Sequence, residues 1–337
     1  MNTIKYIFLF IFVFQLNAQK SDFSTITFEK ADRIALEYKN EKLTNLPELA
    51  YKLTSDLTTD VERFRAIFKW VCSNVANDYY LYSKNMRKRQ RYKNDSVRLK
   101  DWNDEFKKVI FQKLRRNNRT ICTGYAYLIK ELANLANIDC EIVHGFAKTS
   151  TINIETLDVP NHSWNAVKLS GKWYLCDPTW ASGIPDPESA QFEFQFNDGF
   201  FLSDPNIFAV NHFPVDEKWS LLNDDQPSFN TFLDAPIIYN KAYTYFSNHN
   251  APKKLHTDIR KNEHVIFKLQ LLKSVKKEDV NLLIDTTFTS KKIHPESISI
   301  KDQSLTIDYT FDTTGYYDVH LYVKDDLIST YTVEVNK

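Results

Sequence analysis

The sequence is poor in glycine and has no excess of charge of either sign. It holds 6 glycines in 337 residues, with neither a GxGxxG nor a GxxxxGK[ST] pattern. Loops that cradle phosphates through glycine backbone are therefore missing, and nucleotide chemistry is not expected. The 43 basic and 43 acidic residues balance, so the composition does not favour nucleic acid or an anionic membrane as a partner.

Cysteine is scarce as well. The four residues Cys72, Cys122, Cys140 and Cys176 form no CxxC pair, which excludes a small disulfide scaffold and a thioredoxin-type motif. A metal cluster of Cys122, Cys140, Cys176 and His162 is conceivable by composition but lacks the ligand spacing of zinc sites, so we expect no metal and no cofactor. If one cysteine is a working thiol, at most one disulfide can form among the other three. For Cys140 and Cys176 we favour buried thiols over a cross-strand disulfide.

The longest apolar run lies at the N-terminus and is short. Lys5 precedes an apolar stretch from Tyr6 to Phe14, and the sequence LNA follows; this order is typical of a secretory signal peptide. Such a run is too short to cross about 30 Å of hydrocarbon as a helix. We expect cleavage after Ala18, a mature chain from Gln19, export to the periplasm or the extracellular space, and no stable membrane insertion afterwards. A retained, uncleaved tether is the alternative.

Two segments in the first half have a clear character. Residues 59–76 combine Thr59 and Glu62 in capping-box spacing with apolar residues at helical period, which predicts an amphipathic helix. Residues 84–119 carry 14 Lys and Arg against four Asp and Glu. This basic segment is either a patch for an anionic partner or, as we favour, a solvated loop and helix face.

The middle of the chain predicts a helix, a turn and three strands. Cys122 falls just before or at the first turn of a helix, where exposed N–H groups and the helix dipole favour a thiolate. A short β-branched strand follows at residues 140–146, and then SWNAVKL and KWYLCDP, joined by SGK as a tight hairpin. His162 lies at the start of the first hairpin strand and Asp177 at the end of the second. Antiparallel pairing therefore brings these two residues together.

Cysteine, histidine and aspartate in this placement can perform nucleophilic catalysis. A cysteine nucleophile needs a base within about 3 to 4 Å and a third group that fixes the tautomer and orientation of the base. The chain order Cys122, His162, Asp177 supplies all three groups. We interpret His144 and His212 as structural histidines rather than a second base.

The same residues carry a family resemblance. The motifs CTGYAYL, HSWNAV and DPTW resemble the three core motifs of the transglutaminase-like superfamily, the papain-related group that includes the kyphoscoliosis peptidases. Residues 44–80 are similar to the helical lead-in of the bacterial members, and FFLSDP and HFPVDEKWSLL resemble the segment that closes their catalytic domain.

The resemblance implies a fold and residue roles. The fold would be α+β: a papain/transglutaminase-like catalytic domain with a helical lead-in and a cysteine-bearing helix packed on an antiparallel sheet. Cys122 would be the nucleophile, His162 the general base and then acid, and Asp177 the group that orients the imidazole. Trp164 and Trp180 match the motif aromatics, and we interpret them as packing that shields the site from water. The backbone N–H of Cys122 is the minimal oxyanion donor.

Beyond about residue 226 the pattern changes to that of an all-β region. HVIFKLQL, SLTIDYTF and GYYDVHLYV alternate with period two, which predicts an antiparallel sandwich of immunoglobulin-like type. We therefore divide the chain into a signal peptide (1–18), a catalytic domain (19–226) and an immunoglobulin-like β domain (227–337). The last would pack against the catalytic domain or bind a partner.

Three functions remain compatible with the sequence. The first is a cysteine peptidase or amidase that acts on a protein or peptide through an acyl-enzyme, and the second is an acyltransferase that passes the acyl group from a protein glutamine to an amine. Both use the same residues, and the outcome depends on whether water or an amine reaches the thioester. We favour hydrolysis because the resemblance is to the peptidase-like members. The third is a non-catalytic assembly or adhesion module. The sequence does not define the oligomeric state.

Overall fold

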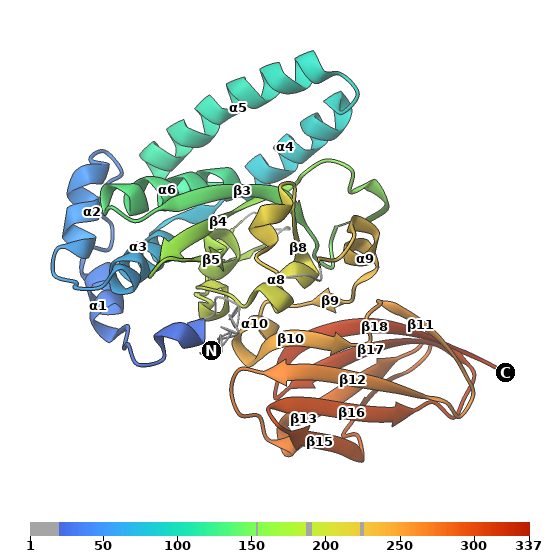
Figure 1. Cartoon of the computed structure of the whole chain (residues 1–337). Helices are drawn as coiled ribbons and strands as arrows, with labels where there is room; N and C mark the ends of the chain where they lie inside the picture. Colours follow the sequence, from blue (N-terminus) through green and yellow to red (C-terminus); the bar gives the residue numbers. More distant parts are fainter. Residues whose placement is uncertain (1–19, 153, 187–190, 223–225) are drawn as a thin grey trace, which may run out of the picture.

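The computed structural model describes residues 20–152, 154–186, 191–222 and 226–337. The predicted signal peptide and its cleavage site lie outside the described residues. Within the described part of the chain, no helix is both long and apolar enough to cross a membrane. A helix-rich part is followed by a sheet-rich part (Figure 1), so the predicted mixture of helix and sheet is confirmed.

The first part packs helices against a four-stranded antiparallel sheet of strand order β5-β4-β3-β8 (Figure 1). Its helices are α1 (Glu29–Glu37), α2 (Leu46–Thr54), α3 (Asp60–Asn74), α4 (Tyr79–Tyr92), α5 (Ser96–Asn117), α6 (Cys122–Leu135), α7 (Pro178–Ser182), α8 (Pro205–Asn211), α9 (Phe229–Asp234) and α10 (Ala242–Tyr245). The sheet strands are β3 (Cys140–Ala147), β4 (His162–Leu169), β5 (Lys172–Cys176) and β8 (His212–Pro214). Two small pairs accompany it: β1 (Ala76–Asn77) with β2 (Arg119–Thr120), and β6 (Gly183–Pro185) with β7 (Phe192–Phe194).

Helix α3 confirms the helix expected at residues 59–76. The side chain of Thr59 accepts a hydrogen bond from the backbone N–H of Glu62, whose carboxylate in turn accepts one from the N–H of Thr59. This capping box satisfies two N–H groups that the helix itself leaves unpaired. The apolar face of the helix, including Phe64, Phe68 and Val71, is fully buried and forms the centre of the helical layer.

Helix α6 carries Cys122 to the sheet. Ile121 is its N-cap residue and Cys122 is its first residue. Leu128, Ile129 and Leu132 are buried, and the helix packs across β3 and β4. Burial of such side chains stabilises by about 1.5–3 kcal/mol each, so this face fixes the helix on the sheet.

The hairpin of β4 and β5 follows the prediction from SGK. The two residues between the strands, Ser170 and Gly171, have φ values of 50° and 83°. Positive φ at both positions of a two-residue loop is the geometry that matches the twist of an antiparallel pair. The register pairs Leu169 with Lys172 and Asn165 with Cys176, so the start of β4 and the end of β5 lie at the same edge of the sheet.

The second part consists of two sheets facing each other across an apolar core (Figure 1). One sheet has the order β10-β12-β16-β15 and the other β11-β18-β17-β13-β14, with β9 paired to β18. The strands are β9 (Ile237–Ile238), β10 (Phe246–Ala251), β11 (His256–Arg260), β12 (His264–Leu271), β13 (Val280–Asp285), β14 (Ser290–Ile293), β15 (Ser297–Lys301), β16 (Ser304–Thr310), β17 (Gly315–Val323) and β18 (Asp326–Asn336).

Alternation along β12 and β13 buries every second residue, as the period-two pattern predicts. The expected sheet-rich C-terminal region is therefore confirmed, while its immunoglobulin-like type stays a prediction. Helix α9 packs on the sheet of the first part, where Phe229 contacts Phe146 and Phe213.

Candidate active site

The structure brings the three residues singled out in the sequence to one edge of the sheet. Cys122 is the first residue of α6, His162 is the first residue of β4, and Asp177 directly follows β5. All three are buried, with 6%, 7% and 0% of their surfaces exposed. The nucleophile candidate therefore comes from the helical layer, and the imidazole and carboxylate come from the sheet.

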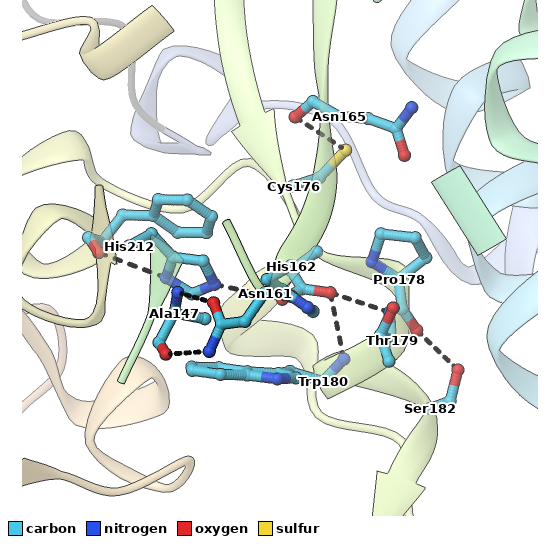
Figure 2. A network of polar contacts seen from close by, with 12 residues as sticks. Ala147, Asn161, His162, Asn165, Cys176, Pro178, Thr179, Trp180, Ser182 and His212 are labelled. Atoms are coloured by element: carbon cyan, nitrogen blue, oxygen red, sulfur yellow. Dashed lines mark hydrogen bonds and ion pairs between the residues drawn. The ribbon is translucent and has the colours of Figure 1, made fainter. Parts of the chain in front are cut away.

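Asp177 uses both of its carboxylate oxygens. Oδ2 lies 2.7 Å from Nε2 of His162, while Oδ1 accepts hydrogen bonds from the backbone N–H groups of Thr179 at 2.8 Å and Trp180 at 3.1 Å (Figure 2). Through Oδ1 the residue is the N-cap of α7, and Pro178 at the first helical position is pre-set for this start. The helix cap thus fixes the oxygen that faces His162.

Of the two ring nitrogens of His162, Nε2 is engaged with Asp177. His162 also interacts with Cys122 and lowers the pKa of the thiol, so Nδ1 is the nitrogen available to exchange a proton with Cys122. The carboxylate holds a proton on Nε2 and leaves Nδ1 free to accept the thiol proton. The arrangement of the three side chains is therefore compatible with proton transfer between Cys122 and His162, with Asp177 as the group that orients the imidazole.

Electrostatics favour the charged form of the Cys122–His162 pair. Burial raises the pKa of Cys122, but hydrogen bonding to His162 and its positive charge, with the N–H of Ser163, overcome this and lower the pKa below its usual value. Burial likewise opposes charge on His162, yet Asp177 and the thiolate raise its pKa to about 10. Asp177 is itself buried, and the two imidazoles that face it lower its pKa. Both shifts favour the thiolate and imidazolium form of the pair.

The other three thiols behave differently. Cys72, Cys140 and Cys176 are free and buried like Cys122, which agrees with the thiol interpretation of Cys140 and Cys176. Burial raises the pKa of each of the three. Because the thiolate is the nucleophile, Cys122 is the one cysteine of this sequence that the fold activates.

His212 joins the site as a second imidazole, which the sequence analysis interpreted as structural. Its Nε2 lies 3.1 Å from the same Oδ2 of Asp177 that faces His162 (Figure 2). It is 2% exposed, and burial lowers its pKa more than Asp177 raises it. Its Nδ1 lies 3.2 Å from the carbonyl oxygen of Phe208, so both ring nitrogens of His212 face acceptors, and the contact of Nε2 with Oδ2 gives Asp177 a fourth polar partner.

The sheet topology explains how His212 arrives there. Strand β3 lies between β4 and β8, with Gly145 paired to His162 on one side and Ala147 paired to His212 on the other. Gly145 is required by this crowding, because a Cβ there would lie 2.3 Å from the carbonyl oxygen of Phe213 and 2.4 Å from the Trp164 ring. The amide of Asn161, just before His162, holds the backbone of Ala147 at 2.7 and 2.9 Å.

Two tryptophans enclose the imidazoles. The ring of Trp180 lies 5.4 Å from that of His162 and 4.4 Å from that of His212, and the buried Trp164 lies 6.1 and 5.1 Å from them. These contacts agree with the interpretation of both tryptophans as packing. Excluding water strengthens the charge interactions within the site.

The same edge of the sheet could also bind a cation. His162, Asp177 and His212 are close enough together to act as three metal ligands, and the surface residues His256, Asp258 and Glu334 form a similar group. In the buried group, the hydrogen bonds of Asp177 already account for the arrangement, since its carboxylate oxygen needs two donors and the imidazoles supply them.

A thiol at a helix start that faces an imidazole and a carboxylate on a neighbouring sheet is the arrangement that nucleophilic cysteine chemistry requires. Residues 47–178 match the family model described as the transglutaminase-like superfamily. The chain therefore contains a transglutaminase-like domain, and the matched segment holds Cys122, His162 and Asp177.

Three of the similar proteins come from animals. The chain is 32% identical over 204 residues to Kyphoscoliosis peptidase of Homo sapiens, covering 59% of this chain and 27% of that protein. It is 31% identical over 223 residues to Kyphoscoliosis peptidase of Mus musculus, covering 65% and 30%. It is 25% identical over 234 residues to Hillarin of Drosophila melanogaster, covering 65% and 26%. The chain thus spans less than a third of the length of these relatives.

Proposed function

We propose that the protein is a cysteine-nucleophile enzyme that cleaves amide bonds in a protein or peptide through a thioester on Cys122. The observation that carries the proposal is the selective activation of one thiol. Of four buried cysteines, only Cys122 has a lowered pKa, and it alone faces a buried imidazole held by a carboxylate. The peptidase name of two relatives supports this choice of reaction.

We assign the roles in the proposed reaction from the positions of these residues. The Cys122 thiolate attacks the carbonyl carbon, and the oxygen takes up the electron pair of the carbonyl π bond. The first backbone N–H groups of a helix have no partner within it, so the N–H of Cys122 can donate to this oxyanion. His162 then gives its Nδ1 proton to the leaving amine as the C–N bond breaks, which leaves a thioester and a neutral imidazole.

Hydrolysis completes the cycle on the same residues. A water molecule gives a proton to Nδ1 of His162 while its oxygen attacks the thioester, and the C–S bond breaks to release a carboxylic acid and restore the thiolate. Asp177 keeps the imidazole in the productive tautomer throughout. An amine in place of water would give acyl transfer, which the test below separates from hydrolysis.

The test is incubation of the protein with a mixed peptide library, with and without a primary amine, and analysis of the products by mass spectrometry. We expect new peptide termini with water as the acceptor and only minor amine incorporation. Cys122→Ala should abolish turnover with an unchanged circular dichroism spectrum, because this residue contributes reactivity rather than core volume. Cys140→Ala is the matched buried-thiol control and should retain activity. Turnover by Cys122→Ala, or products that are mainly amine adducts, would contradict the proposed reaction.

A further inference from the structure

The basic segment at residues 84–119 packs against the residue that precedes Cys122. Helices α4 and α5 make a hairpin along one side of the first part (Figure 1). Its apolar side packs Leu81, Phe106 and Ile110 against Ile121, the residue next to Cys122. At the other end of α4, Lys93 forms an ion pair with Asp158 at 2.6 Å, which ties the hairpin to the segment leading into β4.

Arg89 lies on α4 between the two ends that make these contacts. It is partly buried, and it interacts electrostatically with Cys122 and Tyr82. It also interacts with His144 of β3, whose Nδ1 lies 2.9 Å from Oγ of Ser163, the residue after His162. The contacts of α4 with Ile121 and with Asp158, which precedes β4, flank Arg89 in the chain; this position agrees with a guanidinium near the starts of α6 and β4.

Among the described residues, no carboxylate forms an ion pair with Arg89, and its Nε is buried without a hydrogen-bond partner. Partial burial lowers the pKa of Arg89 because the charged form is held away from water. The buried Arg65, by contrast, is paired with two carboxylates. An unpaired guanidinium beside a reactive centre is suited to a planar anion, which it binds through two parallel hydrogen bonds.

We propose that Arg89 binds a carboxylate of the substrate next to the amide that Cys122 attacks, so that the protein acts on acidic peptide segments. This inference rests on the proposed function. The proposal combines the two interpretations of the basic segment, a solvated face and a patch for an anionic partner. Most cations of the segment, such as Lys84, Arg87 and Arg91, are exposed to solvent, and Arg89 alone is assigned to the anionic substrate.

The first test measures Arg89 without any turnover. The alkylation rate of Cys122 is measured with iodoacetate, which carries a carboxylate, and with neutral iodoacetamide, and the ratio of the two rates is compared among variants. Arg89→Met should lower this ratio about tenfold while leaving the iodoacetamide rate close to that of the native protein. Arg91→Met, which removes an exposed arginine of the same helix, should leave the ratio unchanged. An unchanged ratio in Arg89→Met would overturn the inference.

The iodoacetamide rate also distinguishes a competing role. If Arg89→Met slows both reagents equally, the arginine stabilises the thiolate rather than a substrate anion, and the inference is wrong. If the iodoacetamide rate is retained, the variant is folded and its thiolate is intact, so the ratio alone decides.

The second test uses peptide pairs that differ by Glu and Gln beside the cleaved bond, and pairs with a free or amidated C-terminus. The native protein should prefer the acidic member through a lower KM, and Arg89→Met should remove that preference with little change in kcat. The two series show whether a side-chain or a terminal carboxylate is bound. Cleavage of both members alike by the native protein would refute the acidic preference and leave the proposed function standing. Absence of cleavage would contradict the proposed function, while the alkylation ratio would still report on Arg89.

Discussion

Replacing Asp177 with asparagine should leave Cys122 in its thiol form at neutral pH. The side-chain oxygen of asparagine can still accept the N–H groups of Thr179 and Trp180, so the cap of α7 is kept. The amide nitrogen then takes the place of Oδ2 and donates to Nε2 of His162. The imidazole proton is forced to Nδ1, the nitrogen available to Cys122, and no lone pair remains to accept the thiol proton.

The expected size of the effect on Cys122 follows from the hydrogen bond between His162 and Asp177 that the substitution removes. The contact of 2.7 Å between His162 and Asp177 joins charged groups, and such hydrogen bonds contribute about 1.5–3 kcal/mol. This corresponds to a change of about 10- to 100-fold in the stability of the imidazolium. Asp177 also raises the pKa of Cys122 directly, but this effect is smaller than that of His162, so the net result is a higher pKa of Cys122.

The alkylation rate of Cys122 should depend on pH differently in the native protein and in Asp177→Asn. In the native protein the thiolate forms above the lowered pKa of Cys122, and the imidazolium persists until about pH 10. Alkylation by iodoacetamide should therefore be near its plateau around neutral pH. In Asp177→Asn the thiolate should form only at higher pH, so the rate at pH 6 to 7 should fall about 10- to 100-fold and recover in alkali.

The assay is the alkylation rate of Cys122 against pH, measured from the mass of its peptide. Asp204→Asn is the matched control, since Asp204 is also a buried aspartate at a helix N-cap, with its Oδ1 accepting the N–H of Asn206. The Asp204→Asn profile should match that of the native protein. If the profile of Asp177→Asn also coincides with the native one, Asp177 is not coupled to Cys122 and the proposed orienting role of Asp177 is wrong.

Two further predictions concern His212 and Arg65. His212→Phe removes an imidazole that lowers the pKa of Asp177, so the acid limb of the Cys122 alkylation profile should move to higher pH and turnover should fall about tenfold. The control His144→Phe should leave that limb unchanged. Identical acid limbs in the native protein and both variants would contradict a link from His212 to the site. Arg65→Met leaves the two carboxylates that Arg65 bridges without their cation and should lower the free energy of unfolding, measured in urea, by about 2–3 kcal/mol. Arg63 is more exposed, and Arg63→Met should lower the free energy of unfolding by less than about 1 kcal/mol. Equal losses in the two variants would show that the burial of Arg65 does not matter for stability.

Local patterns in the sequence predicted the elements that hold the site. The spacing of Thr59 and Glu62 places the start of α3, and the turn at Gly171 sets the hairpin that brings His162 to Asp177. These features depend on hydrogen bonds and φ preferences between close neighbours, which a short sequence window contains.

The contributions of His212 and Arg89 could not be predicted in this way. His212 reaches Asp177 only because β8 pairs with β3 on the side opposite β4, and nothing within its own short motif reports that pairing. Arg89 is one of many cations in a basic segment, and its partial burial depends on how α4 packs near Ile121. Long-range pairing and helix docking decide both positions.

The separation of the thiol from its imidazole has a consequence for the unfolded chain. Cys122 belongs to a helix, whereas His162 and Asp177 belong to a hairpin whose two strands are close together in the sequence. Before the helix docks, Cys122 is an ordinary cysteine with a pKa of about 8.5 and little thiolate at neutral pH. A newly synthesised chain is therefore protected from its own chemistry, and the appearance of fast alkylation during refolding would time the moment at which helix and sheet come together.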